Sequence, residues 1–148
     1  AGAKVTAAPD GLRVRAAGRP RPVDVRTEPH PGFPTDLQAP WMSYMCLARG
    51  TARIREAVFE NRFMHAAELA RMGARIATRG ERAVVEGLPE LAGAPIMASD
   101  IRAGAALVVA GLAAKGRTVI QRVYHIDRGY ERIETKLRAL GARIRRVK

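Results

Sequence analysis

Several residue types are scarce in this chain of 148 residues, and each scarcity excludes a class of protein. A single cysteine, Cys46, rules out an internal disulfide, and its place in an apolar stretch indicates a buried thiol. His30, His65 and His125 lack the spacing of metal ligands, so we expect no metal site and no cofactor. The longest apolar run, residues 103–114, is too short to span a membrane, and no signal peptide is visible. The sequence predicts a cytoplasmic protein with no membrane partner.

Positive charge is abundant, with 26 Lys and Arg against 14 Asp and Glu and a net charge of +12. This excess is compatible with nucleic-acid binding or with a site for small anionic substrates. Arginine far outnumbers lysine, and its forked guanidinium suits carboxylate and phosphate groups. The few aromatic residues are not interleaved with the basic ones, so platforms for stacking bases are missing. We therefore favour the small-anion interpretation and expect no nucleic-acid partner.

The chain contains an internal repeat, and the repeated segment has the length of a supersecondary unit. Thr35-Asp36 and Ser99-Asp100 each precede a long apolar run, as helix N-caps do, and the two aspartates are 64 residues apart. Other landmarks recur in the same order: Arg62 and Arg128 are 66 residues apart, and Gly73 and Gly141 are 68 apart.

Each copy closes with a similar phrase, Gly-Ala-Arg-Ile at 73–76 and at 141–144, in which the glycine ends a helix and a strand follows. A third version, Gly-Ala-Lys-Val at 2–5, opens the chain. We therefore divide the chain into the end of one unit (1–22), a unit at 23–94 and a unit at 95–148. We expect it to be the C-terminal part of a longer polypeptide.

Hydrophobic periodicity predicts the elements of each unit. The stretches at 37–48 and 101–114 are helices so apolar that we expect them to be buried on all sides, with sheets outside them. The predicted order is strand, helix, strand, helix, strand, strand, which makes an α/β fold. The remaining predicted elements are strands at 23–27, 52–57, 75–78, 83–86 and 118–123, amphipathic helices at 64–72 and 130–140, and a hairpin of 4–6 with 12–15.

Four residues at repeated positions form a candidate site. Asp36 and Asp100 lie at helix N-termini, and Arg62 and Arg128 lie at strand-to-helix turns. Helix N-termini and arginines favour anions, and an aspartate among them stays ionised and can accept a proton from a substrate hydroxyl. Considered singly, each aspartate could be explained as a helix cap and each arginine as a solvated surface charge. The interpretation as a binding site therefore depends on their recurrence in both units.

Four stretches carry a resemblance to a known family: Phe-Pro-Thr-Asp-Leu-Gln-Ala (33–39), Phe-Glu-Asn-Arg-Phe-Met-His (59–65), Met-Ala-Ser-Asp-Ile-Arg-Ala (97–103) and Tyr-His-Ile-Asp-Arg-Gly-Tyr-Glu-Arg-Ile-Glu (124–134). They resemble the C-terminal part of the UDP-N-acetylglucosamine enolpyruvyl transferases. The resemblance implies an inside-out α/β barrel of repeated units in a two-domain enzyme. It also implies transfer of the enolpyruvyl group from phosphoenolpyruvate to the sugar 3-hydroxyl of UDP-N-acetylglucosamine, the first committed step of peptidoglycan synthesis.

The resemblance further implies a role for seven positions in this chain. They are Asp36 as general base at that hydroxyl, Arg62 and Arg128 at the phosphoenolpyruvate carboxylate and the charged intermediate, Asp100 and Arg102 as a further active-site pair, and Val58 and Phe59 lining the nucleotide-sugar pocket.

Three features of the family have no counterpart in this chain: a lysine near the start, a loop with a reactive cysteine, and an arginine of the same half. Cys46 lies in the wrong segment to replace that cysteine. We therefore expect the catalytic N-terminal half to be a necessary partner, and the chain alone to have no useful transferase activity. Two alternatives remain: an enzyme of the 3-phosphoshikimate 1-carboxyvinyltransferase type, and a non-catalytic basic domain that binds nucleic acid.

Overall fold

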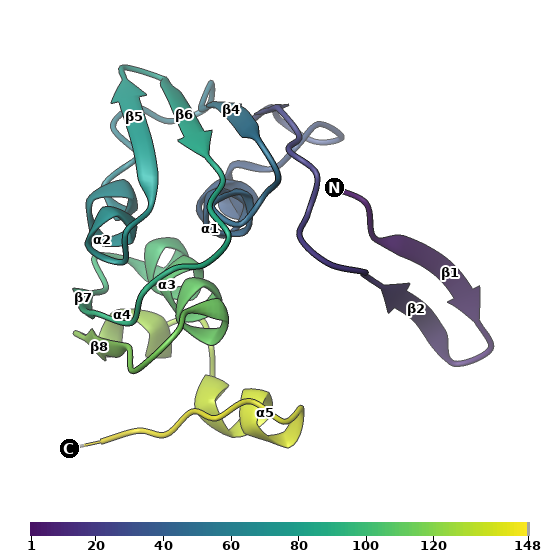
Figure 1. Ribbon diagram of the computed structural model, residues 1–148, viewed down its shortest axis with the longest axis vertical. Coiled ribbons are helices and arrows are strands. Elements are labelled where there is room, and N and C mark those ends of the chain that lie inside the picture. The colour runs from purple at the N-terminus through teal and green to yellow at the C-terminus, as the bar shows by residue number, and fades with distance from the viewer. Residues whose placement is uncertain (148) are drawn as a thin grey trace.

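A computed structural model describes residues 1–147 and shows an α/β arrangement (Figure 1). Residues 23–94 follow the predicted order of strand, helix, strand, helix, strand, strand. Their elements are β3 (Val25–Arg26), the 3₁₀ turn η1 (Thr35–Leu37), α1 (Gln38–Met45), β4 (Thr51–Arg55), α2 (His65–Arg71), β5 (Arg75–Arg79) and β6 (Arg82–Glu86).

The strands of this unit form one four-stranded sheet in the order β3-β4-β6-β5. β3 runs parallel to β4, and the other two pairings are antiparallel. Alternate residues of the two central strands are buried, including Ile54 and Val85, whereas their neighbours are exposed. One face of the sheet therefore covers the helices, as the two-residue period predicts.

The second unit repeats the first four elements of this order, strand, helix, strand and helix, with an additional short helix before the last of them. Its elements are β7 (Pro95–Met97), α3 (Ile101–Ala113), β8 (Val119–Gln121), α4 (Tyr124–Asp127) and α5 (Ile133–Ala139). β7 pairs with β8 in parallel, as β3 does with β4. Gly141 ends the helical region with a φ of +94°, but the strand predicted after it is absent from residues 142–147. A strand needs a neighbour for its backbone hydrogen bonds, and no described strand pairs with this segment.

A separate hairpin of β1 (Lys4–Ala8) and β2 (Gly11–Arg15) projects from the rest of the chain (Figure 1). Val5 lies opposite Val14 in its register, and in the β5–β6 hairpin Ile76 lies opposite Val85. Val85 is buried under helices, but Val5, Leu12 and Val14 are 57%, 74% and 62% exposed. The hairpin thus presents an apolar face that no described element covers.

α1 and α3 pack together at the centre of the molecule, and the Ser43 hydroxyl donates to the Ala106 carbonyl at 2.9 Å. Met42, Met45 and Leu107 are fully buried there, together with Ile54 and Leu69. The prediction that both helices are buried on all sides was wrong for α3, because Val109 and Leu112 are 41% and 46% exposed. No strand described in residues 1–147 covers this side of α3.

The bounds of several elements differ from the predictions. The strands predicted at 23–27 and 118–123 are limited to Val25–Arg26 and Val119–Gln121. The helix predicted at 37–48 ends at Met45, and the segment at 124–128 is a short helix rather than a turn. The helix predicted at 130–140 begins only at Ile133, because Arg132 has a left-handed φ of +49°. No helix in residues 1–147 combines the length and apolar character needed to cross a membrane.

Candidate active site

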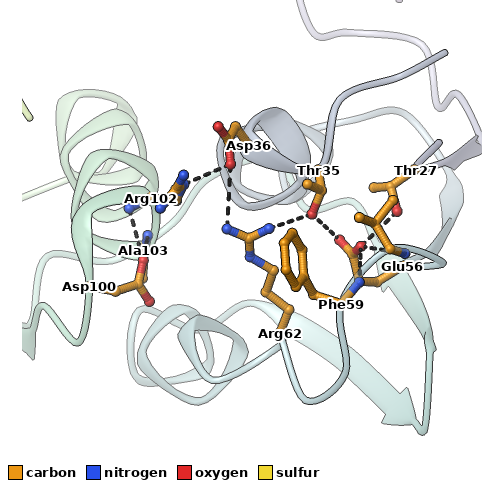
Figure 2. A network of polar contacts seen from close by, with 10 residues as sticks. Thr27, Thr35, Asp36, Glu56, Phe59, Arg62, Asp100, Arg102 and Ala103 are labelled. Atoms are coloured by element: carbon orange, nitrogen blue, oxygen red, sulfur yellow. Dashed lines mark hydrogen bonds and ion pairs between the residues drawn. The ribbon is translucent and has the colours of Figure 1, made fainter. Parts of the chain in front are cut away.

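Asp36 lies in η1, immediately before α1, where two arginines converge on it (Figure 2). Its Oδ1 accepts a hydrogen bond from Arg102 Nε at 2.7 Å and one from Arg62 Nη2 at 3.4 Å. Its Oδ2 has no hydrogen-bond partner within residues 1–147, and the side chain is 58% exposed. One carboxylate oxygen is therefore anchored while the other is open to a ligand.

The arginines make Asp36 a stronger acid. The hydrogen bond from Arg102 is the main cause that lowers the pKa of Asp36 below 3.8, and the charges of Arg102 and Arg62 act in the same direction. Asp36 is therefore ionised at neutral pH, as predicted from the sequence. A carboxylate held in this way accepts hydrogen bonds readily but is a weak base for as long as both arginines remain on it.

Arg62 is the most firmly held of the predicted residues. It follows Asn61, which has a left-handed φ of +52°, in the segment between β4 and α2. Its Nη1 donates to the Thr35 hydroxyl at 2.6 Å, and its guanidinium lies 4.6 Å from the centre of the Phe59 ring. Only 23% of the side chain is exposed, so most of Arg62 is held between its protein neighbours.

Asp100 and Asp36 occupy repeated positions but have different contacts. Asp100 caps α3, since its Oδ1 accepts from the backbone N–H groups of Arg102 at 2.8 Å and Ala103 at 2.9 Å (Figure 2). Asp36 caps neither η1 nor α1 through its side chain. The capping interpretation is therefore confirmed for Asp100 and was wrong for Asp36. Through this cap, Asp100 fixes the first turn of α3, from which Arg102 reaches Asp36.

The Phe59 ring packs against the Arg62 guanidinium, and Val58 and Phe59 are 38% and 55% exposed. Their backbone N–H groups both donate to Glu56 Oε1, at 3.0 and 3.1 Å. Glu56 is 2% exposed, and sequence reasoning missed it because a glutamate at the end of a strand is usually solvated. The signal that was available is the alternation Ala52, Ile54, Glu56, which continues the buried face of β4.

Arg128 follows α4 and is exposed, and its guanidinium makes no hydrogen bond or ion pair with any residue of 1–147. The adjacent Gly129 approaches Ile101 closely: a Cβ at Gly129 would lie 2.8 Å from Ile101 Cγ2. Arg128 therefore belongs to the segment beside the start of α3, but it is not joined to the cluster of Asp36, Arg62 and Arg102.

Two other candidate side chains are buried. Desolvation raises the pKa of the Cys46 thiol to about 12, so this cysteine is not a nucleophile at neutral pH. Burial lowers the pKa of His65 to about 4, and its Nε2 has no partner in residues 1–147. Within the same residues, no group of three or more His, Cys, Asp or Glu side chains is placed to hold a metal ion. A hollow of about 380 Å³ lies away from Asp36, between α3, β8 and residues 143–147, and is lined by Val108 and Leu112.

Comparisons with known proteins found a matching family model and similar sequences. The model of the family described as EPSP synthase (3-phosphoshikimate 1-carboxyvinyltransferase) matches residues 1–137. The UDP-N-acetylglucosamine 1-carboxyvinyltransferase of Anaeromyxobacter sp. (strain Fw109-5) is 68% identical over 148 residues, which are 100% of this chain and 35% of that protein. The protein of the same name from Magnetococcus marinus is 60% identical, over 99% of this chain and 35% of its own length.

Solved structures show the same fold. The enolpyruvyl transferase NikO from Streptomyces tendae has a TM-score of 0.86 and 35% identity, covering 97% of this chain and 33% of that chain. EPSP synthase from Acinetobacter baumannii has a TM-score of 0.57 at 17% identity, over 80% of this chain and 29% of that chain. This chain thus spans about a third of the length of the relatives it matches.

Proposed function

Because the chain belongs to the family of EPSP synthase (3-phosphoshikimate 1-carboxyvinyltransferase), we propose that it is the C-terminal part of a UDP-N-acetylglucosamine enolpyruvyl transferase. In this proposal, residues 1–22, 23–94 and 95–148 are the end of one unit and two further units of an inside-out α/β barrel. The complete enzyme acts in the cytoplasm, in peptidoglycan synthesis. The names of relatives at 60% and 68% identity support the nucleotide sugar, rather than shikimate 3-phosphate, as acceptor.

The observation that carries the proposal is the convergence of Arg62 and Arg102 on one oxygen of Asp36. The open Oδ2 accepts the hydrogen bond, and then the proton, of the acceptor hydroxyl. Forked guanidinium groups bind the carboxylate of phosphoenolpyruvate and stabilise the charged intermediate from which phosphate is released. Val58 and Phe59, exposed beside Arg62, line the pocket of the nucleotide sugar.

The shared arginines also supply a means of activating Asp36. An anionic substrate that attracts Arg62 or Arg102 weakens the contact of that arginine with Asp36. Because these contacts lower the pKa of Asp36, their weakening raises it and makes the carboxylate a better base. Binding of phosphoenolpyruvate thus prepares Asp36 for the acceptor hydroxyl. Arg128, exposed beside α3, is a further arginine that contacts the charged intermediate.

The test is phosphate release from phosphoenolpyruvate by the complete polypeptide that carries this chain, with UDP-N-acetylglucosamine or shikimate 3-phosphate as acceptor. We expect turnover with the nucleotide sugar, and turnover slowed by about 10²- to 10⁴-fold for Asp36→Asn. Asp24→Asn is the matched control, since Asp24 contacts Arg53 at an exposed position outside the candidate site. Preferential turnover of shikimate 3-phosphate, or an Asp36→Asn variant as active as the control, contradicts the proposal.

A second measurement concerns the chain alone. Stabilisation of the transferring group requires donors on both sides of the cleft, and this chain supplies one side. We therefore expect the chain alone to release no phosphate above the uncatalysed rate, and detectable turnover would overturn this part of the proposal. Retention on DNA that weakens steeply with salt and does not depend on Asp36 would favour the nucleic-acid alternative.

A further inference from the structure

Glu56 is a buried carboxylate that accepts four hydrogen bonds beside the candidate site. Its Oε1 accepts from the Thr27 hydroxyl at 2.7 Å, and Oε2 accepts from the Thr35 hydroxyl at 2.9 Å. The other two donors are the backbone N–H groups of Val58 and Phe59. No Lys or Arg within residues 1–147 contacts Glu56 directly. A charge in such a position is costly unless its hydrogen bonds are satisfied, so the surrounding atoms are held in place around it.

The contact with Thr35 links Glu56 to Arg62 in a directional chain (Figure 2). Arg62 Nη1 donates to the Thr35 hydroxyl oxygen, and the hydroxyl donates its single proton to Glu56 Oε2. Arg62 has only donors and a carboxylate has only acceptors, so the direction of both bonds is fixed. With Nη1 held in this way, Nη2 faces Asp36.

The two backbone contacts fix the opposite side of Arg62. Glu56 Oε1 holds the amides of Val58 and Phe59, and the Phe59 ring lies against the Arg62 guanidinium. One buried carboxylate thereby orients both the segment predicted to line the sugar pocket and the arginine beside the predicted base.

We propose that Glu56 is a positioning residue of the transferase: through Thr35 it sets the orientation of Arg62 towards Asp36, and through two amides it sets the Val58–Phe59 segment. This proposal rests on the proposed function. Glu56 touches no reacting atom, since its oxygens are occupied by the four donors and its side chain is buried. None of the roles implied by the family resemblance falls on it.

Glu56→Gln tests the direction of the chain. The amide oxygen can keep the three bonds made to Oε1, but the amide nitrogen places a donor where the Thr35 hydroxyl donates. The bond to Thr35 is then lost or reversed, and Arg62 is released from its fixed orientation. Thr35→Val severs the same link without altering Glu56, whereas Thr35→Ser keeps the hydroxyl. Glu86→Gln is the matched control, because Glu86 pairs with Arg75 at 2.7 Å on the exposed face of the sheet.

The kinetic measurement is the pH profile of kcat/KM for the complete polypeptide. Because Arg62 lowers the pKa of Asp36, its release shifts the acidic limb of the profile to higher pH. For Glu56→Gln and Thr35→Val we expect this shift to higher pH. We also expect turnover to be slowed by about 10- to 100-fold, because Arg62 is misplaced. Thr35→Ser and Glu86→Gln should retain the profile of the unaltered protein. Glu56→Gln with an unshifted profile, or Thr35→Ser as impaired as Thr35→Val, would overturn the proposal.

A spectroscopic measurement on the full chain separates failure of this proposal from failure of the proposed function. Amide protons that donate to a carboxylate resonate at low field, so we expect the Val58 and Phe59 resonances to move upfield in Glu56→Gln and the Arg62 Nε signal to shift in Thr35→Val. Glu86→Gln should alter none of them. If the unaltered polypeptide lacks transferase activity but these shifts occur, the proposed function fails while Glu56 still positions the segment. If the shifts are absent, Glu56 has no such role.

Discussion

Two arginines from different repeat units share one oxygen of Asp36, and this sharing determines the chemistry of the residue. Arg62 belongs to the unit of Asp36, whereas Arg102 comes from the next one, 66 positions along the chain. The sequence predicted Asp36 and Arg62 in one site because each recurs at the equivalent position of the next unit, as Asp100 and Arg128. It did not predict the contact with Arg102, since periodicity locates a residue on a helix but not the distant side chain that it meets. It did not reveal Glu56, whose role depends on burial.

Arg102→Gln is expected to raise the pKa of Asp36 towards the value of an ordinary aspartate. The hydrogen bond from Arg102 is the largest of the effects that lower this pKa, and a neutral amide cannot replace the charge. The measurement is titration of the Asp36 carboxyl carbon by NMR. Arg53→Gln, which alters the ion pair with Asp24 at 3.6 Å, should leave the titration unchanged. A lowered pKa that persists in Arg102→Gln would contradict the geometry.

His65 should make the fold sensitive to mild acid. Its pKa is about 4 in the folded chain and about 6.5 when exposed, so the unfolded chain binds the proton first as the pH falls. The full stability is present above pH 6.5 and is lost towards pH 4, by roughly 3 kcal/mol if the whole shift is realised. Urea unfolding at pH 7 and pH 4.5 measures this difference. We expect His65→Gln to reduce the difference in unfolding free energy between the two pH values. His30→Gln, at an exposed position, should leave this difference unchanged.

At the scale of elements, the glycine-containing phrase was the most reliable sequence signal. Gly2, Gly73 and Gly141 adopt φ angles of +95°, +89° and +94°, so the same local conformation recurs three times. The strand that follows forms in the first two copies and not in the third. Local sequence therefore fixed where the backbone turns, whereas strand formation also required a hydrogen-bonding neighbour, which no periodicity reveals.

Glycines in α3 allow a direct test of helix packing. A Cβ at Gly104 would lie 2.5 Å from Ile126 Cγ1, whereas one at Gly111 would lie 3.3 Å from Thr118 Cγ2. Gly104→Ala should therefore destabilise the chain by about 1–3 kcal/mol through overpacking. Gly111→Ala should be neutral or stabilising by up to about 1 kcal/mol, because alanine favours helix and Thr118 is only half-buried. Equal effects of the two changes in thermal unfolding would contradict this packing.

At the scale of the whole molecule, apolar surface remains uncovered on the β1–β2 hairpin and on α3. The equivalent hairpin, β5–β6, covers helices with its apolar face, so the face of Val5, Leu12 and Val14 has the character of a core surface. The net charge of +12 opposes the association of copies through such a face. Salt screens this repulsion without weakening apolar contact.

We therefore expect the isolated chain to self-associate with rising concentration, and more strongly in high salt. Replacing Val5, Leu12 and Val14 together by Thr should lower the association measured by sedimentation velocity. Replacing Thr6 and Arg13 by Ala, on the opposite face of the hairpin, should not lower it. A chain that stays monomeric at all salt concentrations would show that these side chains do not mediate self-association.

The bond between Asp36 and Arg102 crosses from one repeat to the next. Two such repeats on separate chains would form this contact by a bimolecular encounter, so its occupancy would fall on dilution. Because one chain carries both repeats, Arg102 has a fixed effective concentration at Asp36. This effective concentration does not depend on the protein concentration. Because both repeats lie within a single polypeptide, the ionisation of Asp36 is an intramolecular property. The two copies are free to diverge: Asp36 binds two arginines, whereas Asp100 caps a helix.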